Sequence, residues 1–186
     1  MSKAVKPRGR QLIVDADIMR SASGNENDLA IRCRDVLDAI QQTGHQVIRT
    51  PAIETEWDKH ASGFALRWIV EMQSRRRLLD VDETATGLAG ALAHLSASAA
   101  EQKIMLKDCH LLEAALASEQ RVISKDEAAY FHFYHASGTI SQLRTIMWAS
   151  PMREADACAA WLAAGAKPET KRRIGRRPHR SHPDFL

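Results

Sequence analysis

The residues in this sequence whose types and spacing best suit chemistry are acids that follow short apolar runs or begin helices. Four of them recur in that setting: Asp15, Glu56, Asp108 and Asp126. Carboxylate oxygens are hard ligands that select Mg²⁺ or Mn²⁺ over zinc, and four of them in one place would repel one another without a cation. Two such ions roughly 4 Å apart can activate water and stabilise the leaving oxygen of a phosphodiester. These acids therefore predict a site for divalent cations.

The elements that must position these acids alternate between strand and helix. Short apolar runs predict strands at about 11–14, 46–49, 121–124 and 145–148. Strands separated by helices form a parallel sheet with right-handed crossovers, so their carboxyl ends lie at one edge, where open α/β sheets bind ligands. We therefore expect an α/β fold, a three-layer sandwich with a central, mostly parallel sheet of four to five strands. From the run 12–19 alone, Asp15 and Asp17 suit a plain strand end and turn equally well.

The predicted helices follow from capping residues and apolar spacing. An amphipathic helix starts at Asp28 and ends at Gly44, and Thr50-Pro51 begins the helix that carries Glu56. Further segments are assigned in order: a helix from Ser62-Gly63 to about 77, a connection at 78–83, an alanine-rich helix at 84–103, a helix at 106–116 and a last helix from Ser150-Pro151 to about 164. Asp108 is expected in the first turn of helix 106–116, where the helix dipole would favour its ionised form. His110 is expected to point away from Asp108.

Composition predicts one domain with two basic ends. The 186 residues are 45% hydrophobic, enough for one core, which we place at 11–164 after a basic lead-in at 1–10. The three cysteines, Cys33, Cys109 and Cys158, form no C-x-x-C pair, which favours a reducing compartment. No apolar segment approaches the roughly 20 residues needed to cross a bilayer. We expect a cytoplasmic protein without a membrane partner.

The segment 165–186 is a basic tail that is expected to be flexible. Seven basic residues face two acidic ones there, within a chain of net charge +3. Basic tails make salt-sensitive contacts with phosphate backbones, although an inert solvated terminus is almost as common. The candidates for nucleic-acid contact are Lys171, Arg172, Arg173, Arg176 and Arg177.

Four short blocks in the right order resemble the PIN domain family of metal-dependent nucleases. The blocks are Leu12 to Met19, Thr50 to Trp57, Asp108 to Leu112 and Val122 to Asp126. Two positions depart from the family pattern, because Asp17 stands where asparagine is common and Trp57 replaces an aliphatic residue. Each block is weak alone, and their order and spacing carry the resemblance.

The resemblance implies a PIN-like fold and a metal-dependent endoribonuclease that hydrolyses single-stranded RNA. It assigns Mg²⁺ or Mn²⁺ to Asp15, Glu56, Asp108 and Asp126, with Ser124 hydrogen-bonding and orienting a ligating carboxylate. Asp17 would tune the charge of the site. The family includes toxins of toxin–antitoxin pairs and is often dimeric, so an antitoxin protein and a second copy of the chain are implied partners besides RNA.

Two other functions compete with this interpretation. Asp15-Ala16-Asp17 after a buried strand also resembles the loop of haloacid-dehalogenase-type phosphatases, in which Asp15 would be the nucleophile and Asp17 the acid/base with one Mg²⁺. That alternative leaves Glu56 and Asp108 unexplained. The third possibility is a non-catalytic PIN-like module that binds RNA, which the presence of all four acids disfavours.

Overall fold

Five parallel strands form the central sheet of the computed structural model, which describes residues 9–82, 85–95 and 97–176. The strands are β1 (Gln11–Val14), β2 (Gln46–Arg49), β3 (Leu78–Asp80), β4 (Arg121–Ile123) and β5 (Met147–Ala149). Their order across the sheet is β3-β2-β1-β4-β5, and every pairing between them is parallel. The sheet confirms the predicted α/β class. The strand order reverses between β1 and β4, which is where such sheets bind ligands.

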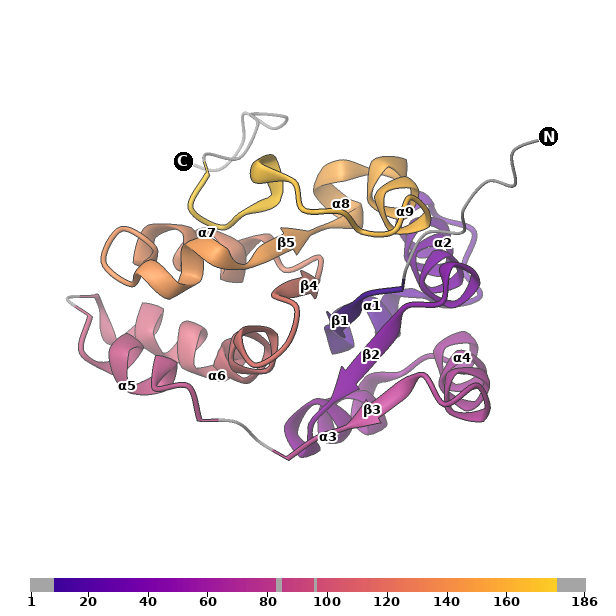
Figure 1. Ribbon diagram of the computed structural model, residues 1–186, viewed down its shortest axis with the longest axis horizontal. Coiled ribbons are helices and arrows are strands. Elements are labelled where there is room, and N and C mark those ends of the chain that lie inside the picture. Colours follow the sequence, from indigo (N-terminus) through magenta and orange to yellow (C-terminus); the bar gives the residue numbers. More distant parts are fainter. Residues whose placement is uncertain (1–8, 83–84, 96, 177–186) are drawn as a thin grey trace.

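Helices cover both faces of this sheet (Figure 1). They are α1 (Ala16–Ser21), α2 (Asp28–Thr43), α3 (Pro51–His60), α4 (Gly63–Ser74), α5 (Leu88–Ala93), α6 (Ala99–Leu116), α7 (Glu127–Ala136), α8 (Pro151–Glu154) and α9 (Asp156–Ala163), with 3₁₀ turns η1 (Ser141–Thr145) and η2 (Thr170–Arg172). On one side α2 packs against α9, α8 and α4, and on the other α6 contacts β1 and β4 beside α5 and α7. The result is a three-layer sandwich. None of the described helices combines the length and apolar composition needed to span a membrane.

The predicted capping residues fix several helix boundaries. Gly44 ends α2 with a φ of 87°, a left-handed conformation that favours glycine. Thr50 begins α3 by accepting a hydrogen bond from the Ile53 amide (3.3 Å). Ser62 begins α4 in the same way through the Ala65 amide (3.2 Å). These three boundaries are confirmed, and together they place α3 at the end of β2.

Several predicted segments differ from the structure. The connection at 78–83 contains β3, a short edge strand whose half-exposed residues give no apolar run. The helix predicted at 84–103 is interrupted between α5 and α6, because Ser98 and Glu101 form a reciprocal capping box that begins α6 at Ala99. α4 ends at Ser74, before the predicted 77. The last helix is divided at Ala155, whose φ is 48°.

The domain extends beyond the predicted boundary at 164. Ile174 is fully buried, and its amide donates to the Ile146 carbonyl (3.0 Å). Arg173 forms an isolated antiparallel bridge with Met147. The expectation of a flexible tail is therefore wrong for residues 165–176, because apolar burial and backbone hydrogen bonds fix this segment. Residues 1–8 of the lead-in and 177–186 of the tail lie outside the described part of the chain.

Candidate active site

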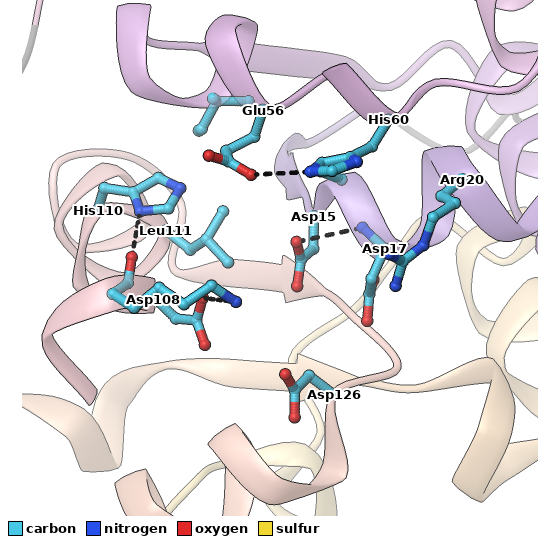
Figure 2. Close-up of a pocket in the computed structure, with 12 residues that line it drawn as sticks. Asp15, Asp17, Arg20, Glu56, His60, Asp108, His110, Leu111 and Asp126 are labelled. Carbon is cyan, nitrogen blue, oxygen red and sulfur yellow. Dashed lines mark hydrogen bonds and ion pairs between the residues drawn. The ribbon is translucent and has the colours of Figure 1, made fainter. Parts of the chain in front are cut away.

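A pocket of about 160 Å³ lies beyond the carboxyl ends of β1 and β4. It gathers all four predicted acids and Asp17, and Figure 2 shows their side chains around a common space. Its lining residues are Asp15, Ala16, Asp17, Arg20, Ile53, Glu56, His60, Lys107, Asp108, His110, Leu111 and Asp126. These residues come from four separate parts of the chain, which the crossover connections bring to one edge.

Asp15 comes directly after β1 and begins α1. Its carboxylate accepts a hydrogen bond from the Asp17 amide (3.3 Å), and its own amide donates to the Ile123 carbonyl at the end of β4 (2.9 Å). The Ser124 hydroxyl donates to Asp15 Oδ2 (2.7 Å). The predicted hydrogen bond from Ser124 to an acid of the site is thus present, and it fixes the direction in which Asp15 faces the pocket.

Asp17 and Asp126 are held by the same turn after β4. The Lys125 amide donates to Asp17 Oδ2 (3.0 Å). The Asp126 amide donates to Ser124 Oγ (3.0 Å), and Asp126 Oδ1 caps α7 by accepting from the Ala129 amide (2.9 Å). Asp17 therefore lines the pocket as closely as the predicted acids do, and it is anchored by the chain instead of standing free in solvent.

Glu56 reaches the pocket from α3, whose position is fixed by the neighbouring Trp57. The Trp57 indole donates to the Val14 carbonyl (3.0 Å), which joins α3 to the last residue of β1. Glu56 itself forms an ion pair with Lys59 (3.6 Å), and one of its carboxylate oxygens lies 3.5 Å from His60 Nε2. Its side chain is 38% exposed, so it forms the open side of the pocket.

Asp108 lies in the middle of α6 and not in a first helical turn. The prediction was wrong because the capping box at Ser98 starts the helix earlier, so the helix dipole gives Asp108 no support. Asp108 is only 8% exposed, and its charged neighbour is Lys107 (Nζ to Oδ1, 3.4 Å). A carboxylate that is buried this deeply needs positive charge beside it, and the ammonium group of Lys107 supplies part of that charge.

Burial and mutual repulsion raise the pKa values of three pocket acids. Desolvation is the largest cause for Asp15, Asp17 and Asp108. The charge of Asp15 raises the pKa of Asp17 further, and the charges of Asp15 and Asp126 do the same for Asp108. The hydrogen bond from Ser124 opposes the rise at Asp15. The pocket therefore holds more negative charge than its own hydrogen bonds stabilise, which favours binding of a cation.

Four polar pocket residues were not identified as part of the site from the sequence: Arg20, His60, Lys107 and His110. His60 follows Glu56 by four residues, a helical spacing that could have indicated their contact. His110 was expected to point away, yet it lines the pocket. Lys107 and Leu111 are four residues apart and therefore lie on the same side of α6. Asp108 and His110 lie on either side of them, so both can line the pocket.

The donor set suits Mg²⁺ or Mn²⁺ by its chemistry, without forming a complete cage. Within residues 9–82, 85–95 and 97–176, no three histidine, cysteine, aspartate or glutamate side chains stand close enough to hold a metal ion between them. Mg²⁺ needs fewer, because it keeps several waters and binds through one or two carboxylates together with substrate phosphate. Asp15 and Asp126 are two such carboxylates, and Ser124 positions both residues by donating to the Asp15 carboxylate and accepting from the Asp126 amide.

The predicted nucleic-acid contacts of the tail are partly wrong. Arg172 is 4% exposed, and its guanidinium pairs with Glu154 and Glu169 and lies over the Trp161 ring. A side chain enclosed in this way holds the C-terminal segment in place and cannot reach a phosphate backbone. Three other candidates, Lys171, Arg173 and Arg176, are exposed, and Arg177 lies outside the described residues.

Comparisons of the chain with protein-family models, with curated proteins and with solved structures gave no match. The residues of the pocket therefore carry the functional assignment.

Proposed function

We propose that this protein is a metal-dependent endoribonuclease that hydrolyses phosphodiester bonds of single-stranded RNA. The observation that supports this most is the convergence of Asp15, Glu56, Asp108 and Asp126 on one pocket at the point where the strand order reverses. The choice of RNA as substrate rests on the resemblance of the four sequence blocks to PIN nucleases. The same resemblance motivates an antitoxin partner, a homodimer and a cytoplasmic location, which stay predictions.

In this proposal Asp15 and Asp126 would bind Mg²⁺ or Mn²⁺ directly, and Glu56 and Asp108 would add negative charge around it. The bound ion would supply an activated water and charge stabilisation for phosphodiester hydrolysis. Ser124 keeps Asp15 oriented, and the Lys125 amide keeps Asp17 at the pocket wall. Lys107 and Arg20 bring positive charge to the rim, where they can bind the phosphate of the substrate. Asp17 adds negative charge beside Asp15 and strengthens the attraction for a cation.

The phosphatase alternative has one observation in its favour. Phosphatases of the haloacid-dehalogenase type usually have a lysine late in the sequence of the site, and the charge of Lys125 acts on Asp17. This alternative gives no role to Glu56 or Asp108, although both line the same pocket. A binding module without catalysis is less compatible with the pocket, because uncompensated carboxylates repel the phosphates of RNA. The nuclease is the only one of the three that uses every acid.

RNA cleavage by matched variants tests the proposal. Wild type and Asp108→Asn are incubated with labelled single-stranded RNA and DNA in Mg²⁺, Mn²⁺ or EDTA. We expect metal-dependent cutting of RNA by wild type and a loss of about a hundredfold or more in the variant, because a carboxylate that attracts the catalytic cation is removed. Asp58→Asn is the control, since Asp58 is exposed on α3 and outside the pocket lining.

Equal cutting by wild type and Asp108→Asn would reject the proposal, because it would place the activity in a contaminant. The phosphatase is tested in parallel with a small aryl phosphate. Asp17→Asn should abolish turnover in a phosphatase of this kind, whereas it should only weaken the nuclease.

A further inference from the structure

A second hollow lies next to the acidic pocket, beyond the end of α1. It measures about 490 Å³ and is lined by residues from the α1–α2 connection, α2 and the start of α4, among them Ser23, Glu26, Arg34, Ser62, Phe64 and Arg67. The two hollows adjoin along both chain segments, because Arg20 and His60 line the first and Ser23 and Ser62 line the second.

Hydrogen bonds hold the wall between the two hollows in place. The Ser62 amide donates to the Met19 carbonyl (3.1 Å), and the Ser62 hydroxyl donates to the Ala22 carbonyl. The last turn of α1 is thereby fixed to the junction of α3 and α4. Figure 2 places Arg20 at the end of the pocket opposite to His110. A single strand of RNA that left the acidic pocket on the side of Arg20 would meet a preformed surface there.

Positive charge runs from one hollow into the other. Neither Arg20 nor Arg67 has a hydrogen-bond or ion-pair partner among the residues that the structure describes. Arg34 donates to the backbone carbonyls of Ser23 and Asn25, which fixes its guanidinium, and it forms no ion pair with a carboxylate in the described part of the chain, although its charge acts on Asp38. Two arginines thus face one acid, Glu26, in the lining of the second hollow.

The second hollow also contains an aromatic ring. Phe64 is half-buried and lines the hollow beside Arg67. A positively charged groove with an aromatic side chain is the combination that binds single-stranded nucleic acid, because arginines follow the phosphates while bases stack on the ring.

We propose that the second hollow binds the part of a single-stranded RNA that extends from the acidic pocket, with Arg20 and Arg67 on its phosphates and Phe64 against a base. The proposal rests on the nuclease function. It differs from the tail hypothesis because it places the phosphate contacts on α1 and α4.

Equilibrium binding of fluorescent single-stranded RNA, measured by anisotropy in EDTA so that no cleavage occurs, tests the proposal. Arg67→Ala should weaken binding about fivefold at 0.1 M salt. The reason is that each phosphate contact with a single strand multiplies the affinity by the molar salt concentration raised to the power of about −0.7. The slope of log affinity against log salt should fall by about 0.7 in magnitude. Phe64→Leu should weaken binding without changing that slope, since stacking releases no counterions.

Arg75→Ala is the matched control, because it removes the same charge at the other end of α4, beyond the hollow. Equal losses in Arg67→Ala and Arg75→Ala would overturn the proposal and show an unspecific effect of net charge. Unchanged binding by Arg67→Ala would overturn it as well. If wild type still cuts RNA in Mg²⁺ in either case, the nuclease function stands. If wild type neither binds nor cuts RNA, both proposals fail.

Discussion

At the scale of single residues, one hydroxyl organises the acids at the end of β4. Ser124 has a single proton, which it donates to Asp15, and its lone pairs accept from the Asp126 amide. Asp17 is instead held by the Lys125 amide. The carboxylates therefore face the pocket before any ligand arrives, which lowers the reorganisation needed on binding.

Holding like charges close together lowers the stability of the folded protein, and a substitution at Asp17 measures this loss. We predict that Asp17→Asn raises the free energy of unfolding without added metal by about 1 kcal/mol, or about 2–4 °C in Tm. The reason is that burial and the charge of Asp15 raise the pKa of Asp17 well above its usual value, so its charged form is unfavourable in the folded protein. Thermal unfolding followed by circular dichroism measures the difference.

The raised pKa of Asp17 also predicts how the stability difference between wild type and Asp17→Asn changes with pH. Because the folded protein holds the Asp17 proton more tightly than the unfolded chain does, wild type gains stability as pH falls through the raised pKa, and the gain is complete below about 3.8. The advantage of Asp17→Asn should therefore shrink as pH is lowered from neutral. An advantage that grows on acidification, or a variant less stable than wild type at neutral pH, would contradict the raised pKa.

The sequence indicated that the acids would lie in one place but not which basic residues would line the same pocket, for a physical reason. Asp15 and Asp126 follow strands, and strand ends of a parallel sheet share one edge, so their meeting follows from topology. His110 and Arg20 line the pocket through the rotation of α6 and α1 about their axes. That rotation is set by packing against the sheet, which a single sequence does not reveal.

At the scale of elements, α6 begins earlier than predicted because of a capping box that lies outside the block around Asp108. The reciprocal hydrogen bonds of Ser98 and Glu101 start the helix at Ala99 and leave Asp108 in its interior. Asp108 therefore lies too far from the helix N-terminus for the dipole to lower its pKa, and its burial raises the pKa instead. β3 was missed for a similar reason, since its pairing with β2 and not its hydrophobicity makes it a strand.

The connection between α2 and β2 contains a second buried titratable group, His45. Its Nδ1 accepts from the Arg10 amide (2.9 Å), so its Nε2 carries the proton and donates to the Leu162 carbonyl (2.9 Å). Burial lowers the pKa of His45, and the charges of Arg121 and Arg10 add to the effect. This side chain joins the lead-in, β2 and α9 only while it is neutral.

We predict that acid destabilises the protein through His45. The folded pKa lies below the unfolded value of about 6.5, so the unfolded chain binds the proton more readily and the free energy of unfolding falls as pH drops below about 6.5. Urea unfolding of wild type and His45→Gln at several pH values measures this. The variant should be less stable at pH 8 and should lose part of the acid-induced decline. The same decline in both proteins would exclude His45 as its cause.

At the scale of the whole molecule, the C-terminal segment completes the domain. Arg172 pairs with Glu154 and Glu169, and the Tyr130 hydroxyl donates to the Arg176 carbonyl (3.3 Å). The basic composition of this segment indicated a flexible tail, because composition counts charges without showing which of them are paired. The domain boundary was therefore less predictable from sequence than the sheet, whose buried apolar runs gave the correct strands at β1, β2 and β4.

Truncation of a buried side chain in this segment should destabilise the whole domain. We predict that Ile174→Ala lowers the free energy of unfolding by about 2–5 kcal/mol, because it leaves a cavity beside β5. Lys171→Ala is the control, since the Lys171 side chain is 71% exposed. Denaturant unfolding compares the two, and a loss below about 0.5 kcal/mol for Ile174→Ala would show that the segment contributes little to stability.

Whether the acidic pocket holds a divalent cation is tested most directly by uptake of Mn²⁺, followed through the paramagnetic resonance signal of the free ion. We predict that wild type removes Mn²⁺ from solution and that Asp108→Asn binds Mn²⁺ at least about tenfold more weakly. Asp58→Asn should bind Mn²⁺ as wild type does. A free-ion signal that wild type leaves unchanged, or equal uptake by wild type and Asp108→Asn, would contradict a cation site formed by these carboxylates.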